Sequence, residues 1–203
     1  MSFDELVRTI RTAWGQRMTA GEHLRALALG WESQGVRERG GDNRGPDVDW
    51  FVHDGGGRAS AAPPWCAYFV SSLCRQVERQ GLPIQYTRTG RAVSHWIKAD
   101  AVQLIHPDQV WSEPAAGLVF VRTRLSKSTA EVLKVRRGVS RQGHTGVVVD
   151  IDPEARTITA IAGNSSGWGH STTKAGGKVA REVITEGDRA WERLVGFVRV
   201  AQP

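Results

Sequence analysis

The chain has 203 residues, of which 40% are hydrophobic, and this is enough to form one domain with a sizeable core. It contains no run of about eighteen apolar residues, which excludes a membrane-spanning helix. The net charge of +6 predicts attraction to polyanions. The basic residues are dispersed, however, and no zinc-finger or other nucleic-acid motif is present, so specific nucleic-acid binding is disfavoured.

The first segment, residues 1–18, is predicted to be a helical extension, because Phe3, Leu6 and Ile10 recur at helical spacing. The start of the chain lacks the basic and then apolar layout of a secretory signal. We therefore expect synthesis in the cytoplasm without a signal peptide. The remaining residues, 19–203, are expected to form the main domain.

Helices are predicted through the first half of the main domain. The spacing of apolar residues predicts a helix over 20–33, a short helical return near 48–52 and a further helix over 90–97. The clearest apolar stripe lies between them and predicts a helix from Cys66 to near Gly81. The rest of the chain is organised around the start of that helix.

Cys66 is predicted to lie in the first helical turn, because Pro63 and Pro64 interrupt the preceding structure and suit a helix start. The unpaired amides and the partial positive charge at a helix start stabilise an anion. The thiolate is the reactive form of cysteine, so Cys66 is a candidate nucleophile. Cys74 lies within the apolar stripe and is predicted to be a packing residue.

His144 is a candidate general base for this cysteine. The stretch 143–150 has glycines and β-branched residues, which is typical of a strand, and 157–162 predicts a second strand that ends near Asn164. Antiparallel pairing of the two strands brings their opposite ends together, so Asn164 is a candidate to orient the imidazole in a Cys-His-Asn set. His95 is a rival base, although a histidine on a short helix is more often a surface or packing residue.

Further strands are predicted near 117–121 and 194–200, so helices occupy the first half of the chain and an antiparallel sheet the second. This order indicates an α+β fold. Two basic segments, about 122–142 and 165–187, are longer than usual connections and are predicted to be inserts that flank the site. They are either solvated loops or surfaces for a substrate or partner.

Five short motifs occur in order across about residues 20–170. They are Gly35-Val36-Arg37-Glu38, Asn43-Arg44-Gly45-Pro46, Pro64-Trp65-Cys66-Ala67-Tyr68-Phe69-Val70, Gly143-His144-Thr145-Gly146 and Gly163-Asn164. Together they resemble the CHAP and NlpC-type cysteine peptidases and amidases that cut bacterial peptidoglycan, in a branch encoded by phages and bacteria. A Gly-Asp pair usual in that family is replaced here by Gly117-Leu118, which leaves the proposed catalytic set untouched.

The resemblance implies a papain-like fold in which N-terminal helices pack on a C-terminal antiparallel sheet. It implies that Cys66 is the nucleophile, His144 the general base and Asn164 the orienting residue. It also places Glu38, Asn43 and Arg44 near the cleft as candidate substrate contacts. Trp65 and Trp168 are candidates to stack on sugar or peptide, although tryptophan more often packs in a core.

The implied activity is hydrolysis of a peptidoglycan amide, by an N-acetylmuramoyl-L-alanine amidase or a peptide endopeptidase. No cofactor is expected, and the cysteines and scattered histidines lack the spacing of a zinc site. The implied place of action is the cell wall or periplasm, reached through a holin, a phage-tail or injection particle, or a secretion system. Two alternatives remain open: a structural or docking component of a phage-tail-like particle with a weak or silent site, and a basic nucleic-acid-binding protein.

Overall fold

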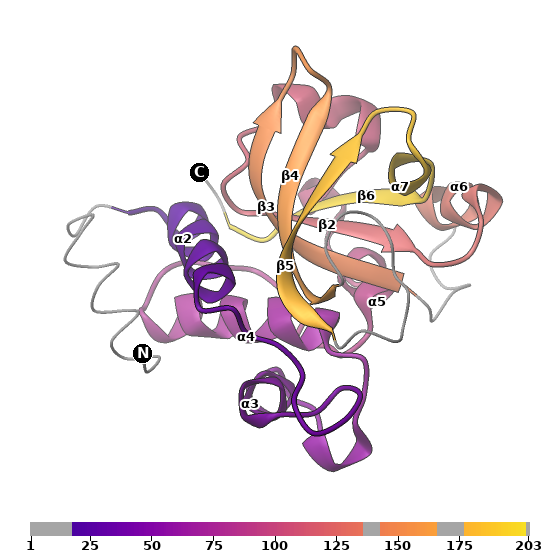
Figure 1. Ribbon diagram of the computed structural model, residues 1–203. Helices are drawn as coiled ribbons and strands as arrows, with labels where there is room; N and C mark the ends of the chain where they lie inside the picture. The colour runs from indigo at the N-terminus through magenta and orange to yellow at the C-terminus, as the bar shows by residue number, and fades with distance from the viewer. Residues whose placement is uncertain (1–17, 136–142, 166–176, 202–203) are drawn as a thin grey trace.

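The computed structural model describes residues 18–135, 143–165 and 177–201, which form an α+β fold. Helices from the first half of the chain group on one side of an antiparallel sheet built from the second half (Figure 1). The predicted fold class, α+β with an antiparallel sheet, is confirmed. The predicted helix near the N-terminus and Trp168 lie outside the described residues.

The α-helices are α2 (Ala20–Ser33), α3 (Pro46–Asp54), α4 (Cys66–Arg79), α5 (Ala92–Ile97), α6 (Lys127–Val135) and α7 (Arg189–Glu192). Short 3-10 helices are η2 (Ala59–Ala61), η3 (Ala101–Gln103) and η4 (Pro107–Ser112). The strands are β1 (Leu104–Ile105), β2 (Leu118–Thr123), β3 (Gly143–Asp152), β4 (Thr157–Ser165), β5 (Lys178–Thr185) and β6 (Leu194–Arg199). They form one sheet in the order β1-β6-β2-β3-β4-β5, with every neighbouring pair antiparallel.

The two long helices follow their sequence signals closely. Helix α2 begins after Thr19, whose side chain accepts a hydrogen bond from the backbone N–H of Glu22 while the Glu22 carboxylate bonds back to the backbone N–H of Thr19. This capping box satisfies amides that a helix start leaves unpaired. Helix α4 begins at Cys66, directly after the proline pair and Trp65, as the sequence predicts.

The sheet separates two apolar cores. Helices α2, α4 and α5 cover one face, where residues such as Leu24, Phe69 and Val147 are fully buried. The other face carries a second core that includes Phe120 and Val148. Side chains alternate between the faces of a strand, so the even-numbered residues of β2 and β3 share the face away from α4.

The sheet curls around its second core. In a flat sheet, edge strands β1 and β5 would lie about 24 Å apart, at about 4.8 Å per strand. Yet Ile105 of β1 and Ile184 of β5 belong to the same buried cluster, which takes residues from all six strands. The face away from α4 is therefore the inside of the curl, and residues from distant strands meet there.

Strand β5 extends the sheet within the segment that the sequence analysis treats as an insert over 165–187. Its outer edge is covered by a short extended stretch: the N–H of Val179 donates to Val36 and the N–H of Glu38 donates to Gly177. The other basic segment, 122–142, also differs from a simple loop. It begins with the last residues of β2 and contains α6, which packs against β6.

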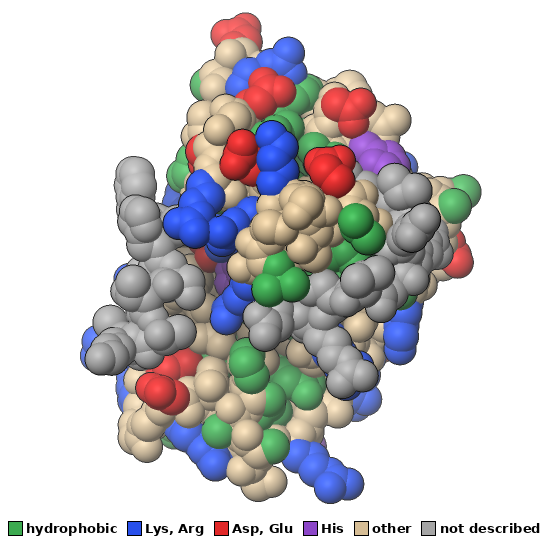
Figure 2. All heavy atoms as spheres, turned by 90° about the vertical axis from the view of Figure 1, so that its right-hand side faces the viewer, with side chains coloured by type: hydrophobic (Ala, Val, Ile, Leu, Met, Phe, Trp, Pro, Cys, Tyr) green, Lys and Arg blue, Asp and Glu red, His purple; other side chains and the backbone are tan. Residues whose placement is uncertain are grey.

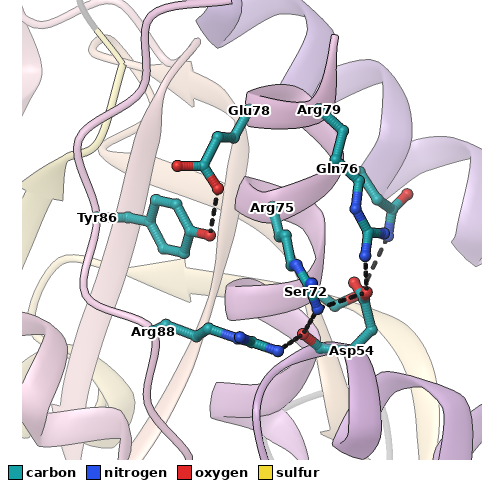
Figure 3. Close-up of polar contacts among 8 residues, drawn as sticks. All are labelled: Asp54, Ser72, Arg75, Gln76, Glu78, Arg79, Tyr86 and Arg88. Atoms are coloured by element: carbon teal, nitrogen blue, oxygen red, sulfur yellow. Dashed lines mark hydrogen bonds and ion pairs between the residues drawn. The ribbon is translucent and has the colours of Figure 1, made fainter. Parts of the chain in front are cut away.

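A buried carboxylate, Asp54, fastens the end of α3 to the middle of α4 (Figure 3). Its Oδ2 accepts a hydrogen bond from Ser72 Oγ at 2.7 Å. Its Oδ1 forms ion pairs with Arg75 at 3.2 Å and Arg79 at 2.9 Å, and its backbone carbonyl accepts a hydrogen bond from Arg88. Asp54 is thus a structural anchor behind the helix that carries Cys66.

We expect Asp54→Ala to lower the free energy of unfolding by roughly 2–3 kcal/mol, because it leaves the buried Ser72 hydroxyl without its acceptor and removes the common partner of two arginines. Urea denaturation measures this change. The matched control is Glu32→Ala, which removes the exposed ion pair to Arg181 and should cost less than about 1 kcal/mol. Equal losses in the two variants would contradict the anchoring role of Asp54.

Candidate active site

Cys66 is the first residue of α4 and is 3% exposed. The placement predicted from the proline pair is therefore confirmed. At this position the backbone N–H groups of the first turn have no partners within the helix, and the helix dipole favours a negative charge. The start of α4 thus stabilises the thiolate form of Cys66.

His144, the predicted base, lies at the start of β3 and interacts with Cys66. Its imidazole is buried, and its Nε2 bonds to Glu182 Oε1 at 2.8 Å. The other ring nitrogen, Nδ1, makes no regular hydrogen bond in the described part of the chain. The imidazole also interacts with the Cys66 thiol, both as a hydrogen-bond partner and as a charge.

The two groups shift each other's protonation in opposite directions. Burial alone would raise the pKa of Cys66, but the hydrogen bond and charge of His144, the charge of Arg124 and the backbone N–H of Thr145 lower it overall. Burial alone would lower the pKa of His144, but the Glu182 charge and the Cys66 hydrogen bond raise it overall. Both shifts act in the direction of a thiolate beside an imidazolium.

Cys74 gives an internal contrast within the same helix. It is fully buried, and burial raises the pKa of its thiol with no imidazole to oppose the effect. Both cysteines are free thiols. The reactive form is thus favoured at Cys66 alone of the two, as expected from their positions along the helix.

Glu182, on β5, completes the set, and the sequence analysis did not select it. Alternation places Ala180, Glu182 and Ile184 on one face of β5, and Ile184 belongs to the core inside the curl of the sheet. Burial alone would raise the pKa of Glu182, but the His144 charge and hydrogen bond, with Arg122 and Ser165, hold it well below its usual range. Glu182 is therefore a carboxylate that orients His144 and stabilises its protonated form.

Asn164 does not contact His144 in the manner predicted. Its Nδ2 donates instead to Asn43 Oδ1 at 3.0 Å. The β4–β5 register shifts between Ala162 and Ser165, and Asn164 has a left-handed φ of 53°. A bulge of this kind changes which face the following side chains occupy. Ser165, and not Asn164, faces the inside of the sheet, where its Oγ donates a hydrogen bond to Glu182 Oε1 at 2.6 Å.

The predicted substrate contacts are brought near the start of α4, but several are engaged within the protein. Trp65 is fully buried, stacks on Phe51 and donates from Nε1 to Glu38 Oε1 at 2.9 Å. This differs from the expected stacking platform, because the ring has no exposed face. Arg44 donates to the backbone carbonyls of Ala59 and Ser60 in and around η2.

These contacts make the loop that carries Glu38, Asn43 and Arg44 a brace for the active site. Glu38 holds Trp65, the residue before Cys66, and Asn43 holds Asn164 at the bulge in β4. The loop therefore ties the start of α4 to the sheet. A direct role for its three polar residues in binding substrate stays a prediction.

His95, the rival base, lies on α5 and is also buried. Burial lowers its pKa to about 4, although a backbone hydrogen bond to Ala67 opposes the shift. His95 is therefore neutral near pH 7. It contacts the backbone of Ala67, the second residue of α4, and not the Cys66 thiol. The imidazole that acts on Cys66 is that of His144.

A sequence signal for Glu182 exists but is weak. The run Val179-Ala180-Arg181-Glu182-Val183-Ile184 alternates in the manner of a strand and places a carboxylate at an inward position. A charged residue is rarely buried unless it is paired, so such a position is a candidate functional site. Only the register of β5 on β4 shows that its partner is His144.

No family model matches the chain, and neither a curated protein nor a solved structure matches it. Functional interpretation therefore depends on the geometry around Cys66, His144 and Glu182. Within residues 18–135, 143–165 and 177–201, no helix is long and apolar enough to cross a membrane, and no three His, Cys, Asp or Glu side chains form a potential metal site.

Proposed function

We propose that the chain is a cysteine hydrolase with a papain-like arrangement that cleaves an amide bond of peptidoglycan. The observation that carries the proposal is the Cys66 thiol at a helix start, paired with His144, whose other ring nitrogen is held by Glu182. This is the order of roles in a nucleophile-base-orienter triad. Glu182 takes the orienting role that the sequence analysis assigned to Asn164.

The triad supports acyl transfer through a thioester. The Cys66 thiolate attacks the amide carbonyl carbon, and the bond to the leaving nitrogen breaks as His144 delivers its proton to the departing amine. A water molecule then attacks the thioester while His144 accepts its proton, which releases the acid and restores the thiol-imidazole pair. The backbone N–H of Cys66, at the helix start, is positioned to stabilise the tetrahedral oxyanion.

The choice of peptidoglycan comes from the five motifs that resemble wall-cutting amidases and endopeptidases. Three of these motifs lie together in space, since Trp65 bonds to Glu38 and Cys66 interacts with His144, and this proximity supports that choice. The cut falls at the N-acetylmuramoyl-L-alanine amide or within a peptide. Synthesis in the cytoplasm and export by a holin, a tail particle or a secretion system belong to the same proposal.

A second candidate function is a docking component of a phage-tail-like or injection particle in which the site is silent. The burial of the reacting groups favours it, because Cys66 and His144 are each only 3% exposed. A substrate carbonyl must approach the sulfur closely for attack. The docking function therefore predicts that substrate does not reach the Cys66 thiol.

Incubation with isolated sacculi decides between the two functions. We expect the wild type and a Cys74→Ala control to release muropeptide fragments, and Cys66→Ala to release none, because the nucleophile is absent. Mass spectrometry of the new termini separates amidase from endopeptidase cleavage. Release by Cys66→Ala would contradict the proposed mechanism, and no release by any form, with sacculi from several bacteria, would favour the docking function.

A further inference from the structure

Arg122 lies beside the catalytic set without contacting the sulfur. It is paired directly opposite His144 in the β2–β3 register, and it shares the inner face of the curled sheet with Phe120. Its guanidinium carbon lies 5.8 Å from the centroid of the Phe120 ring, and its side chain is 14% exposed. Arg122 is therefore held in a mostly buried position next to the imidazole.

The partner of Arg122 is Glu182, three strands away in the sheet order. Flat strands would separate β2 from β5 by about 14 Å, at about 4.8 Å per strand. Both side chains point to the inside of the curl and extend toward each other, so that Arg122 Nη2 and Glu182 Oε2 lie 3.0 Å apart. The ion pair thus crosses the inside of the curl and passes the strand that carries His144.

Both oxygens of Glu182 have a partner. Oε1 bonds to His144 Nε2 at 2.8 Å and accepts a hydrogen bond from Ser165 Oγ at 2.6 Å. Oε2 makes no regular hydrogen bond within the described residues, and its ion pair with Arg122 Nη2 balances its charge. A buried carboxylate with one oxygen unpaired costs considerable free energy and tends to turn toward a new partner or take up a proton. Either response would withdraw Oε1 from the imidazole.

The surroundings of Arg122 also direct it toward Glu182. Arg193, just before β6, is a positive neighbour, and its pKa is lowered first by burial and then by the charges of Arg189 and Arg122. Arg124, beyond the end of β2, acts on the sulfur of Cys66. With the thiolate and the imidazolium formed, Arg122 supplies the positive charge that balances the second buried anion, Glu182.

We propose that Arg122 is a positioning residue that fixes the Glu182 carboxylate on His144. The inference deepens the proposed function, because it concerns the same catalytic set. Ser165 assists from the β4 bulge, but it contacts the oxygen that His144 already uses. Arg122 alone of these three partners secures the second oxygen and so sets the orientation of the carboxylate plane.

The test uses the proton on His144 Nε2, which a strong hydrogen bond to a carboxylate moves far downfield in the proton NMR spectrum. This signal requires no substrate, so its outcome is independent of whether peptidoglycan is cleaved. We expect Arg122→Met and Arg122→Gln to lose the signal or shift it upfield, and Arg122→Lys to retain it because the charge remains. Cleavage of sacculi should fall by on the order of 10²-fold in the first two variants, as a misplaced base is expected to do.

Arg181→Met is the matched control, because Arg181 is the neighbour of Glu182 on β5 and its ion pair is with Glu32 on α2. It should leave the downfield signal unchanged. An unchanged signal in Arg122→Met and Arg122→Gln would overturn the positioning role. Loss of the signal in Arg181→Met as well would also overturn it, since any damage to the sheet would then suffice. If Arg122→Met does not fold, Arg122→Gln and Arg122→Lys decide the question.

Discussion

Replacement of His144 by alanine should reduce cleavage by about 10⁴-fold or more, because the base, the leaving-group acid and the counterion of the thiolate are lost together. The same change should raise the pKa of Cys66 above its ordinary value, since burial then acts with less opposition. Ultraviolet absorbance of the thiolate, titrated against pH and corrected with Cys66→Ser, measures the second effect. Fragment release from sacculi measures the first.

His95→Ala provides the matched control for this prediction. His95 is equally buried and lies next to α4, but it contacts the backbone of Ala67 and not the thiol. Its loss is expected to lower stability while leaving the titration of Cys66 unchanged. If both histidine variants shifted the thiolate titration equally, the pairing of Cys66 with His144 would be refuted.

A second large effect is expected from substitution of Glu182. It distinguishes Glu182 from Asn164 as the residue that orients His144. Glu182→Gln should lower the rate by roughly 10² to 10⁴-fold, since a neutral amide stabilises the imidazolium poorly and permits the wrong tautomer. The Glu182 charge raises the pKa of His144, so its removal lowers that pKa. The imidazolium then loses its proton at a lower pH, and the alkaline limb of the pH–rate profile moves toward neutrality.

Asn164→Ala is the comparison variant. Its side chain bonds to Asn43, so its removal should loosen the brace and change the rate by less than about tenfold, with both limbs of the profile unmoved. Steady-state rates across the pH range measure both variants. The opposite ranking, with Asn164→Ala the more damaging, would restore the Cys-His-Asn set expected from the sequence.

Features set by local sequence were predictable. Helix α2 has the predicted bounds because its apolar spacing and its Thr19 cap agree, and α4 starts at Cys66 because a proline pair precedes it. The strand that carries His144 was predicted from its glycines and β-branched residues. Each of these signals lies within a few residues of the feature that it determines.

The features that the sequence analysis missed depend on contacts between distant segments. The prediction that Asn164 orients His144 assumes an unbroken β-hairpin. In the structure, a bulge in β4 places Ser165 at the inward-facing position instead. Glu182 and Arg122 meet across the inside of the curled sheet, and neither a motif nor a period in the sequence predicts that two strands so far apart in the sheet order share an ion pair. The sequence predicts the β5 segment to be part of an insert, because its lysines and glycines obscure the alternation of inward-facing and outward-facing residues.

The position of Glu182 on the last strand at one edge of the sheet also affects how the site is assembled. Cys66 and His144 are separated by 78 residues (144 − 66), and the carboxylate comes a further 38 residues on. During synthesis from the N-terminus, the thiol and imidazole emerge before the residue that orients them. Long-range pairing of this kind forms slowly, because the chain entropy must be lost before the contacts are gained. A nascent chain that ends before β5 therefore lacks the carboxylate that holds His144, and the set of Cys66, His144 and Glu182 is complete only when β5 has been made and paired.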